Sequence, residues 1–287
     1  MEQPSLILPA ESAGLFLRAG RHGLDVPLWV CGSLEGLAAP AVAVVGTRAP
    51  SGAGRRLAFE TAKNLGKSGV CVISGLALGV DTAAHEGALA AGAPTVGVLG
   101  GGHGHFFPRA NRELAERIVA GGGAVISPYA PHWPVRPRQF LQRNAIVAGL
   151  ADGVAVVEAA ARSGALNTAS HAANLGIPVM AFPGDVDRPK VAGCLALLRD
   201  GATLVRDASD IMEAIGLQVE RDAQSRALDG LEERSRAIVA LLDDGEMDFD
   251  ALLIRAGLDA GELAGRLIEL ELRGIVESRT GARYALT

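Results

Sequence analysis

The densest group of residues suited to binding chemistry lies between Ser127 and Ala151, where the chain reads SPYAPHWPVRPRQFLQRNAIVAGLA without an acidic residue. Arginines neutralise phosphates, and flat side chains offer surfaces on which unpaired bases stack. The segment interleaves both kinds, in the order Tyr129, His132, Trp133, Arg136, Arg138, Phe140 and Arg143. The pattern indicates a site for a single nucleic-acid strand. The alternative is a proline-rich loop whose aromatic side chains pack onto the core.

A glycine-rich turn, VVGTRAPSGAGRR (44–56), lies between an apolar run and a helical stretch. Glycines at such a turn expose backbone amides at a helix N-terminus, where an anion is favoured. Arg48 projects from the turn, and Arg55 opens the helical stretch. The spacing fits neither the dinucleotide fingerprint nor the P-loop. The turn therefore predicts phosphate binding, with a purely structural tight turn as the alternative.

Two further turns repeat this arrangement of small residues before a helix. Ser74 and Gly75 end the run VCVISG, and Ser163 and Gly164 follow Arg162. Several amide-lined turns along one sheet edge favour a polyanion over a single mononucleotide. We therefore expect a groove that binds several phosphates.

Residues that could form a catalytic or metal site are scattered. Asp81 and His85 lie four apart on one helical face, and we interpret them as a hydrogen-bonded pair that fixes the helix, because no third ligand is evident. His103 and His105 are interpreted as solvated residues of a surface loop. Glu158 is a lone carboxylate at a strand end, and no recognised catalytic motif is present. We expect a protein that is not an enzyme and requires no metal or cofactor.

Short apolar runs that alternate with helical stretches must position these residues. The runs are LWV (28–30), AVAVVG (41–46), VCVIS (70–74), TVGVL (95–99), AVIS (124–127), VAVV (154–157), PVMAF (178–182) and TLV (203–205). They are apolar on both faces, as the strands of a helix-covered parallel sheet must be. The alternation predicts a doubly wound, mostly parallel α/β sheet whose ligands bind at the carboxyl ends of the strands.

The pattern changes near Gly216, where the chain becomes polar and lacks a strand. Three amphipathic helical stretches follow, and then two short strands around Thr280 and Gly281, which is the order of a winged helix. The first residues hold too little apolar periodicity for an independent domain. The predicted divisions are an N-terminal stub at 1–27, a core at 28–215, a linker at 216–229 and a winged-helix domain at 230–287.

Composition and charge narrow the class of protein. The 287 residues are 49% hydrophobic, enough to bury a sizeable core. The net charge of −5 lies in residues 230–287, with 12 acidic residues and 7 arginines, because residues 1–229 hold 20 of each sign. There is no basic region of a secretory signal and no apolar run of membrane-spanning length, and the three cysteines are scattered. We expect a cytoplasmic protein without membrane contact.

Several blocks of the sequence resemble the successive signature motifs of the DNA-processing protein A family (DprA/Smf). They are VVGTR followed by Ser51 and Gly54, SGLALGVDTAAHEGAL, QFLQRNAIVAGL, VVEAAARSGALNTA and FPGDVD, in that order. The C-terminal segment is similar to the winged-helix domain that often ends this family. The resemblance implies an extended Rossmann-like core that binds single-stranded DNA without sequence preference. It also implies a homodimer that loads the RecA recombinase onto DNA taken up in natural transformation.

The resemblance assigns roles by motif position. Arg48 would hold a phosphate beside the amides of Gly46 and Thr47, Arg143 with Asn144 would hold the next phosphate, and small-residue turns would form the walls. From its chemistry as much as from the motif, Phe140 is expected to stack on a base. The predicted DNA-binding residues are Gly46, Thr47, Arg48, Arg55, Ser74, Gly75, Arg138, Phe140, Arg143, Asn144, Arg162, Ser163 and Gly164.

The sequence departs from the family pattern in four places. Ala145 replaces the last arginine of the usual Arg-Asn-Arg, Pro128 replaces a usual glutamate, and GGGHGH lacks an aspartate often seen there. The helical N-terminal domain of many relatives is absent or reduced to a stub. The first departure removes one positive charge that the family pattern places at the DNA site.

Two other classes of function compete with DNA binding. One is a nucleotide phosphoribohydrolase, although the Pro-Gly-Gly-x-Gly-Thr-x-x-Glu loop of those enzymes is missing, since Pro183 and Gly184 are followed by Asp-Val-Asp. The other is a scaffold that binds only proteins. The last helical stretch, DAGELAGRLIELELRG, carries four acids and two arginines, so we predict that the winged helix contacts proteins or regulates the core rather than reading duplex DNA.

Overall fold

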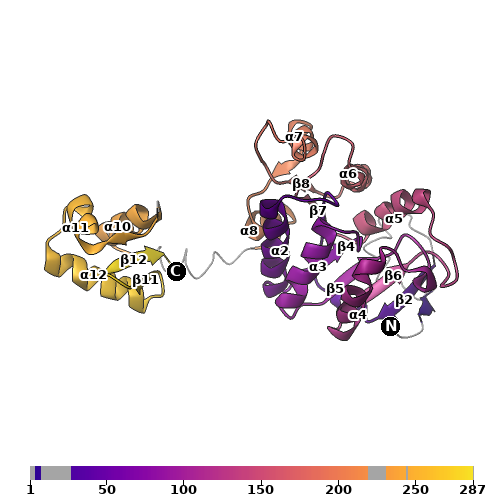
Figure 1. Cartoon of the computed structure of the whole chain (residues 1–287), viewed down its shortest axis with the longest axis horizontal. Coiled ribbons are helices and arrows are strands. Elements are labelled where there is room, and N and C mark those ends of the chain that lie inside the picture. The colour runs from indigo at the N-terminus through magenta and orange to yellow at the C-terminus, as the bar shows by residue number, and fades with distance from the viewer. Residues whose placement is uncertain (1–3, 8–26, 219–230, 244, 287) are drawn as a thin grey trace. The chain divides into compact units, whose positions relative to one another are not determined.

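The structure is a computed structural model that describes residues 4–7, 27–218, 231–243 and 245–286 (Figure 1). The chain divides into two compact units, Met1–Gln218 and Val219–Thr287. Most of the predicted stub and most of the predicted linker lie outside the described residues.

The first unit is built on a nine-stranded sheet with the order β1-β2-β6-β5-β4-β3-β7-β8-β9. Its strands are β1 (Ser5–Ile7), β2 (Leu28–Gly32), β3 (Ala41–Val45), β4 (Cys71–Ser74), β5 (Thr95–Val98), β6 (Ala124–Ser127), β7 (Gly153–Val156), β8 (Val179–Ala181) and β9 (Thr203–Leu204). The strands from β6 to β9 in this order are parallel, which confirms the predicted sheet.

One edge of the sheet differs from the apolar-run prediction. β2 pairs antiparallel with β6, with Trp29 opposite Ser127, and β1 pairs antiparallel with β2. The strand β1 falls inside the segment interpreted as a stub, so part of that segment belongs to the core sheet. Three residues give too short an apolar run to distinguish from a loop, which is why the sequence pattern missed this strand.

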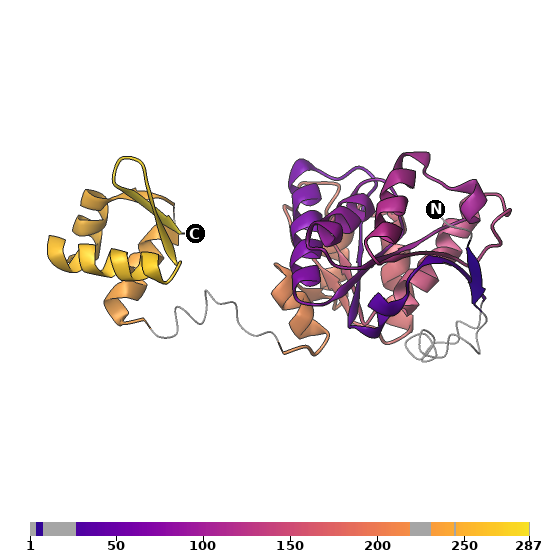
Figure 2. The same ribbon diagram turned by 90° about the horizontal axis from the view of Figure 1, so that it is seen from below.

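Helices cover both faces of the sheet (Figure 2). One layer contains α2 (Gly52–Lys67), α3 (Val80–Ala90), α4 (Arg112–Ala120) and α8 (Ala208–Ala214), in which α3 packs on α2 and α4 and α8 packs on α2. The other contains α5 (Pro137–Gly149), α6 (Gly164–Asn174) and α7 (Ala192–Arg199). Residues of this second layer share one buried apolar cluster with alternate residues of the central strands, such as Ala43, Ile73 and Val156.

The sheet order reverses direction between two neighbouring strands. The chain adds β4, β5 and β6 on one side of β3, and then returns through α5 to place β7 on the other side of β3. Loops leaving β3 and β7 therefore diverge to opposite faces and leave a crevice at their carboxyl ends. Ligands of open α/β sheets bind at this position.

The second unit consists of α10 (Glu233–Asp243), β10 (Met247–Asp248), α11 (Phe249–Ala256), α12 (Ala260–Leu272), β11 (Val276–Arg279) and β12 (Arg283–Leu286). The strands form an antiparallel sheet in the order β10-β12-β11, and the helices bury a leucine-rich core against it. The three predicted helices and the hairpin are present, and β10 is an additional strand. Asp248 and Asp259 begin α11 and α12 by accepting hydrogen bonds from Ala251 N and Glu262 N.

Candidate nucleic-acid interface

A pocket of about 310 Å³ lies at the reversal point of the sheet. Its walls come from the loops after β3, β4 and β7 and from one side of α5. Most of the predicted DNA-binding residues line it, and these are Gly46, Thr47, Arg48, Gly75, Phe140, Arg143, Asn144, Arg162, Ser163 and Gly164. Segments as far apart as β3 and α6 thus converge on one site.

The loop after β3 carries Arg48 on a firmly held backbone. Thr47 N donates to Glu158 O at 2.6 Å, and Val80 N donates to Thr47 O at 3.2 Å. Gly79, with φ +89°, packs so closely that an added Cβ would stand 2.5 Å from Thr47 O. Of the two amides expected beside the Arg48 phosphate, that of Thr47 donates to Glu158 O, so it is not free to bind an anion. The exposed side chain of Arg48 is the group this loop offers to a ligand.

The N-terminus of α2 is not the anion site that its glycines suggested. The carboxylate of Glu158 accepts hydrogen bonds from Ser51 N at 2.8 Å and Ser51 Oγ at 2.6 Å, and Ser51 Oγ accepts from Gly54 N. A Cβ on Gly54 would stand 2.4 Å from the Glu158 carboxyl carbon. The protein's own carboxylate fills this position, which gives the lone glutamate a structural role and leaves Arg55 outside the pocket.

The loop after β4 is joined to α5 by a buried arginine. Arg143 is 4% exposed, and its Nη1 donates to Gly75 O and, at 2.5 Å, to Val98 O. Burial lowers the pKa of the Arg143 guanidinium to about 10, a shift that the nearby Asp81 carboxylate opposes. Arg143 therefore fixes α5 to the ends of β4 and β5 and places a positive charge in the floor of the pocket.

Asp81 and His85 do not form the predicted pair. Asp81 accepts hydrogen bonds from Gly75 N at 3.1 Å and Ala77 N at 3.2 Å, whereas His85 Nδ1 lies 2.8 Å from Thr95 Oγ1. Burial raises the pKa of the Asp81 carboxyl, and the positive charge of Arg143 opposes that shift. Burial also lowers the pKa of His85 to about 3, so this histidine is neutral at pH 7. Each residue fixes a different strand end to α3.

The glycine-rich loop GGGHGH (100–105), which follows β5, holds one histidine inside the protein. His103 is 4% exposed, and its Nε2 lies 2.9 Å from Val125 O. The interpretation of His103 as solvated is wrong, because neighbouring glycines let the loop fold over it: a Cβ on Gly102 would stand 2.1 Å from Ala130 O. His105 is exposed, as predicted. Among the described residues, no cluster of three or more His, Cys, Asp or Glu could hold a metal.

The far wall of the pocket joins α5 to the start of α6. Asn144 Nδ2 donates to Gly164 O and to Asn167 Oδ1, both at 3.2 Å. Ser163 begins α6 by accepting from Ala165 N at 3.3 Å, and a Cβ on Gly164 would meet nothing within 4 Å. Arg162, just before this turn, is exposed. The wall thus offers an arginine and a helix N-terminus to an anion.

An aromatic contact forms the rim beside Arg48. The guanidinium carbon of Arg48 lies 5.6 Å from the centroid of the Phe140 ring, and the Phe107 ring lies 5.9 Å from Phe140 at 64°. Sequence reasoning missed Phe107, because the pair Phe106-Phe107 gives no periodicity that says which ring is buried. The available signal was the position of Phe107 directly before Pro108, in a loop that follows a predicted strand.

The remaining predicted residues lie outside the pocket lining. Ser74 is buried, and its Oγ donates to Val44 O at 2.7 Å, which ties β4 to β3. Arg55 and Arg138 are exposed in the first turns of α2 and α5. The two arginines can add to the positive potential near the pocket but do not form its wall.

The fold and the site together define a doubly wound α/β protein whose switch-point pocket concentrates arginines beside exposed aromatic surface, an arrangement suited to polyanions. The chain belongs to the DNA-processing protein A (DprA/Smf) family. Residues 22–216 match the DNA recombination-mediator protein A family, and residues 222–282 match the DprA winged helix domain.

Individual relatives agree with this assignment. The putative DNA processing protein DprA of Mycobacterium tuberculosis is 40% identical over 290 residues, which covers 98% of this chain and 74% of the relative. The structure of DprA from Streptococcus pneumoniae is 35% identical, with a TM-score of 0.68 over 74% of each chain. DprA from Helicobacter pylori, whose structure concerns its single-stranded DNA binding mode, is 27% identical, with a TM-score of 0.60 over 66% of this chain and 86% of that one.

Proposed function

We propose that this protein binds single-stranded DNA at the switch-point pocket without sequence preference. The observation that carries the proposal is the convergence of Arg48, Arg143 and Arg162 on one pocket with Phe140 at its rim. The pocket lining contains one carboxylate, Asp81, and burial disfavours its charged form. The single-stranded DNA binding of the Helicobacter pylori relative supports the same use here.

The three arginines would contribute to DNA binding in different ways. Arg48 and Arg162 are exposed and can move to contact phosphates directly. Arg143 is held by backbone carbonyls and would act through the potential that its buried charge adds. Contacts to phosphates and to the faces of bases exist for every nucleotide, so a site of this kind does not distinguish sequences.

Family membership supports a wider role. We propose that a homodimer of this protein holds single strands for the RecA recombinase in natural transformation, in the cytoplasm, without catalysis and without a cofactor. Within the described residues, no helix is long and apolar enough to cross a membrane. The winged-helix unit would contact proteins or regulate access to the core, because its third helix offers little free positive charge.

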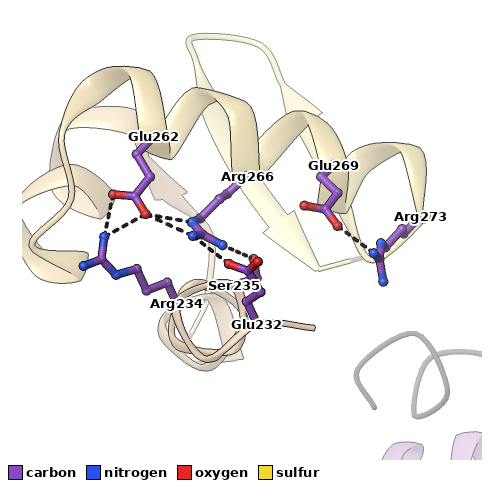
Figure 3. A network of polar contacts seen from close by, with 7 residues as sticks. All are labelled: Glu232, Arg234, Ser235, Glu262, Arg266, Glu269 and Arg273. Carbon is purple, nitrogen blue, oxygen red and sulfur yellow. Dashed lines mark hydrogen bonds and ion pairs between the residues drawn. The ribbon is translucent and has the colours of Figure 1, made fainter. Parts of the chain in front are cut away.

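Arginine pairing in the winged helix supports that last point (Figure 3). On α12, Arg266 Nη2 lies 3.0 Å from both Glu262 Oε1 and Glu232 Oε2, and just after the helix Arg273 Nη2 lies 2.6 Å from Glu269 Oε1. A helix that reads duplex DNA needs cations directed at phosphates. The arginine of this helix and the arginine that caps its end are both engaged by carboxylates.

Anisotropy titration of labelled oligodeoxythymidylate and duplex DNA, across a salt series, tests the proposed function. We expect the single strand to bind more tightly, with a salt slope of about −0.7 for each phosphate contact. Arg48→Ala should weaken binding, whereas Arg199→Ala, at the end of α7 and outside the pocket lining, should not. Equal binding of Arg48→Ala and wild type would contradict the site. Release of free base from a nucleoside monophosphate would instead favour the phosphoribohydrolase alternative.

A further inference from the structure

Two adjacent phenylalanines after β5 have opposite environments. Phe106 is 6% exposed and packs in a buried cluster with Leu76, Leu99 and Leu114. Phe107, the next residue, is 50% exposed. A single exposed apolar side chain is common on protein surfaces, and what sets Phe107 apart is that its ring contacts Phe140, which lines the pocket.

The segment that carries Phe107 is firmly attached to the pocket loops. Asn111, four residues later, donates from Nδ2 to Leu76 O at 2.9 Å, to Ala77 O at 3.1 Å and to Thr82 Oγ1 at 2.9 Å. These acceptors belong to the loop after β4 and to the start of α3, and Ala77 lines the pocket. With Phe106 buried on one side and Asn111 bonded on the other, the backbone at Phe107 is held in place, and the edge contact with Phe140 limits the movement of the Phe107 ring. A ring that is already ordered loses little entropy when a ligand packs against it.

Phe140, in contrast, is largely enclosed by its neighbours. The Arg48 guanidinium lies over its ring at 5.6 Å, and the Phe107 ring meets it at 5.9 Å in an edge-type contact. On another side the backbone closes in, because a Cβ added to Gly100 would stand 2.7 Å from Phe140 Cδ1. The exposed aromatic surface beside Arg48 therefore belongs mainly to Phe107, with Phe140 as its support.

We propose that Phe107 is a base-stacking residue of this protein's single-strand site, and that Phe140 is a positioning residue that holds both Phe107 and Arg48. The proposal rests on the proposed single-stranded DNA binding. A strand whose phosphate is bound by Arg48 would place a neighbouring base on the exposed Phe107 ring. The bound strand would then cross the pocket and continue toward the loop after β5. This changes the prediction that Phe140 itself is the stacking ring.

A coupling experiment on the full chain tests this assignment. The probes are labelled oligodeoxythymidylates, one intact and a series with a single abasic site moved along the strand. The variants are Phe107→Leu, which keeps apolar cover over Phe140 but removes the aromatic face, and Phe107→Trp, which restores a larger one. Phe59→Leu is the matched control, since Phe59 also has a cation over its ring, Lys63 Nζ at 5.9 Å, but lies on α2 outside the pocket.

We expect Phe107→Leu to weaken binding of the intact oligonucleotide by about 5-fold or more, because base–aromatic stacking commonly contributes that much. Phe107→Trp should bind at least as tightly as wild type, and Phe59→Leu should be unchanged. One abasic position should weaken binding to wild type yet have no further effect on Phe107→Leu, which identifies the stacked base. Thermal unfolding of each variant shows whether it is folded.

Three outcomes separate the two levels of inference. If wild type does not bind the oligonucleotide, or Arg48→Ala binds as well as wild type, the proposed function is wrong and the stacking role falls with it. If Arg48→Ala weakens binding but folded Phe107→Leu does not, the stacking role alone is wrong. If Phe107→Leu weakens binding and every abasic position weakens it further by the same factor as in wild type, Phe107 acts by a route other than stacking, which also overturns the proposal.

Discussion

The Arg143 guanidinium donates from Nη1 to the backbone carbonyl of Gly75, and an added Cβ on Gly75 would stand 2.5 Å from the Arg143 guanidinium carbon. The absence of a side chain at residue 75 is thus what allows the arginine to reach the end of β4. Glycine at this turn provides space for a cation, and the sequence had suggested instead an exposed amide for a phosphate. This contact gives Arg143 a structural role that the exposed Arg48 does not have.

Replacing Arg143 by methionine should destabilise the protein, whereas Arg48→Ala should not. The methionine keeps the apolar stem but removes the donor to Gly75 O and Val98 O and the charge beside Asp81. Loss of one partner of a buried charged pair costs about 3–5 kcal/mol, whereas an exposed substitution usually changes stability by less than about 0.5 kcal/mol. Urea unfolding monitored by circular dichroism measures both. Equal stability of Arg143→Met and wild type would show that the buried charge has no structural role.

Stability should decrease as the pH falls below about 6.5, partly through His85. Burial lowers the pKa of His85 from 6.5 to about 3, so the unfolded chain binds a proton at pH 5 and the folded chain does not. The stabilising effect of the neutral ring is complete above pH 6.5 and is lost progressively as the pH falls toward 3. Between pH 7 and pH 5 the loss amounts to about 2 kcal/mol.

The comparison with His85→Asn isolates this contribution. Asparagine can still contact Thr95 Oγ1, which lies 2.8 Å from His85 Nδ1, but it does not titrate. The raised pKa of Asp81 acts with the opposite sign, because the folded state then binds more protons than the unfolded state above pH 3.8. Because asparagine does not titrate, urea unfolding at pH 7 and pH 5 should show a smaller loss of unfolding free energy in His85→Asn than in wild type. An identical loss in both proteins would exclude His85 as a source of the pH dependence.

Local sequence patterns were sufficient for the strands β2 to β9 and for the loops of the site. Apolar runs such as AVIS (124–127) have the length and flanking glycines of buried strands, and every strand predicted from such a run is present. Because the carboxyl ends of parallel strands share one edge, the turn residues Arg48, Gly75 and Ser163 were bound to converge there. The residues that begin helices are also defined by local sequence, because the side chains of Ser51 and Asp259 accept hydrogen bonds from the first turns of the helices that they cap.

What the sequence could not show depends on contacts between distant residues. Glu158 bonds to Ser51, 107 positions earlier, and no spacing rule connects the two. Arg143 stands in a row of arginines, but unlike its neighbours Arg136 and Arg138 it points into the protein. His103 is buried because Gly102 lets the backbone approach Ala130 O. In each case burial decides the role of a polar side chain, and burial is a property of the tertiary structure.

Removing Arg273 from the winged-helix unit should leave the affinity of the full chain for duplex DNA almost unchanged. Arg273 lies 2.6 Å from Glu269 Oε1, so Arg273→Ala in the full chain should alter duplex affinity by less than about 2-fold at low salt, where a free phosphate contact has its largest effect. The complementary variant, Glu269→Gln, frees Arg273 and should raise duplex affinity, because an exposed unpaired arginine at the end of α12 becomes available to phosphates. Anisotropy with a labelled duplex measures both. If Arg273→Ala instead weakens duplex binding several-fold and lowers the salt slope by about one contact, α12 does contact DNA and the ion pair opens on binding.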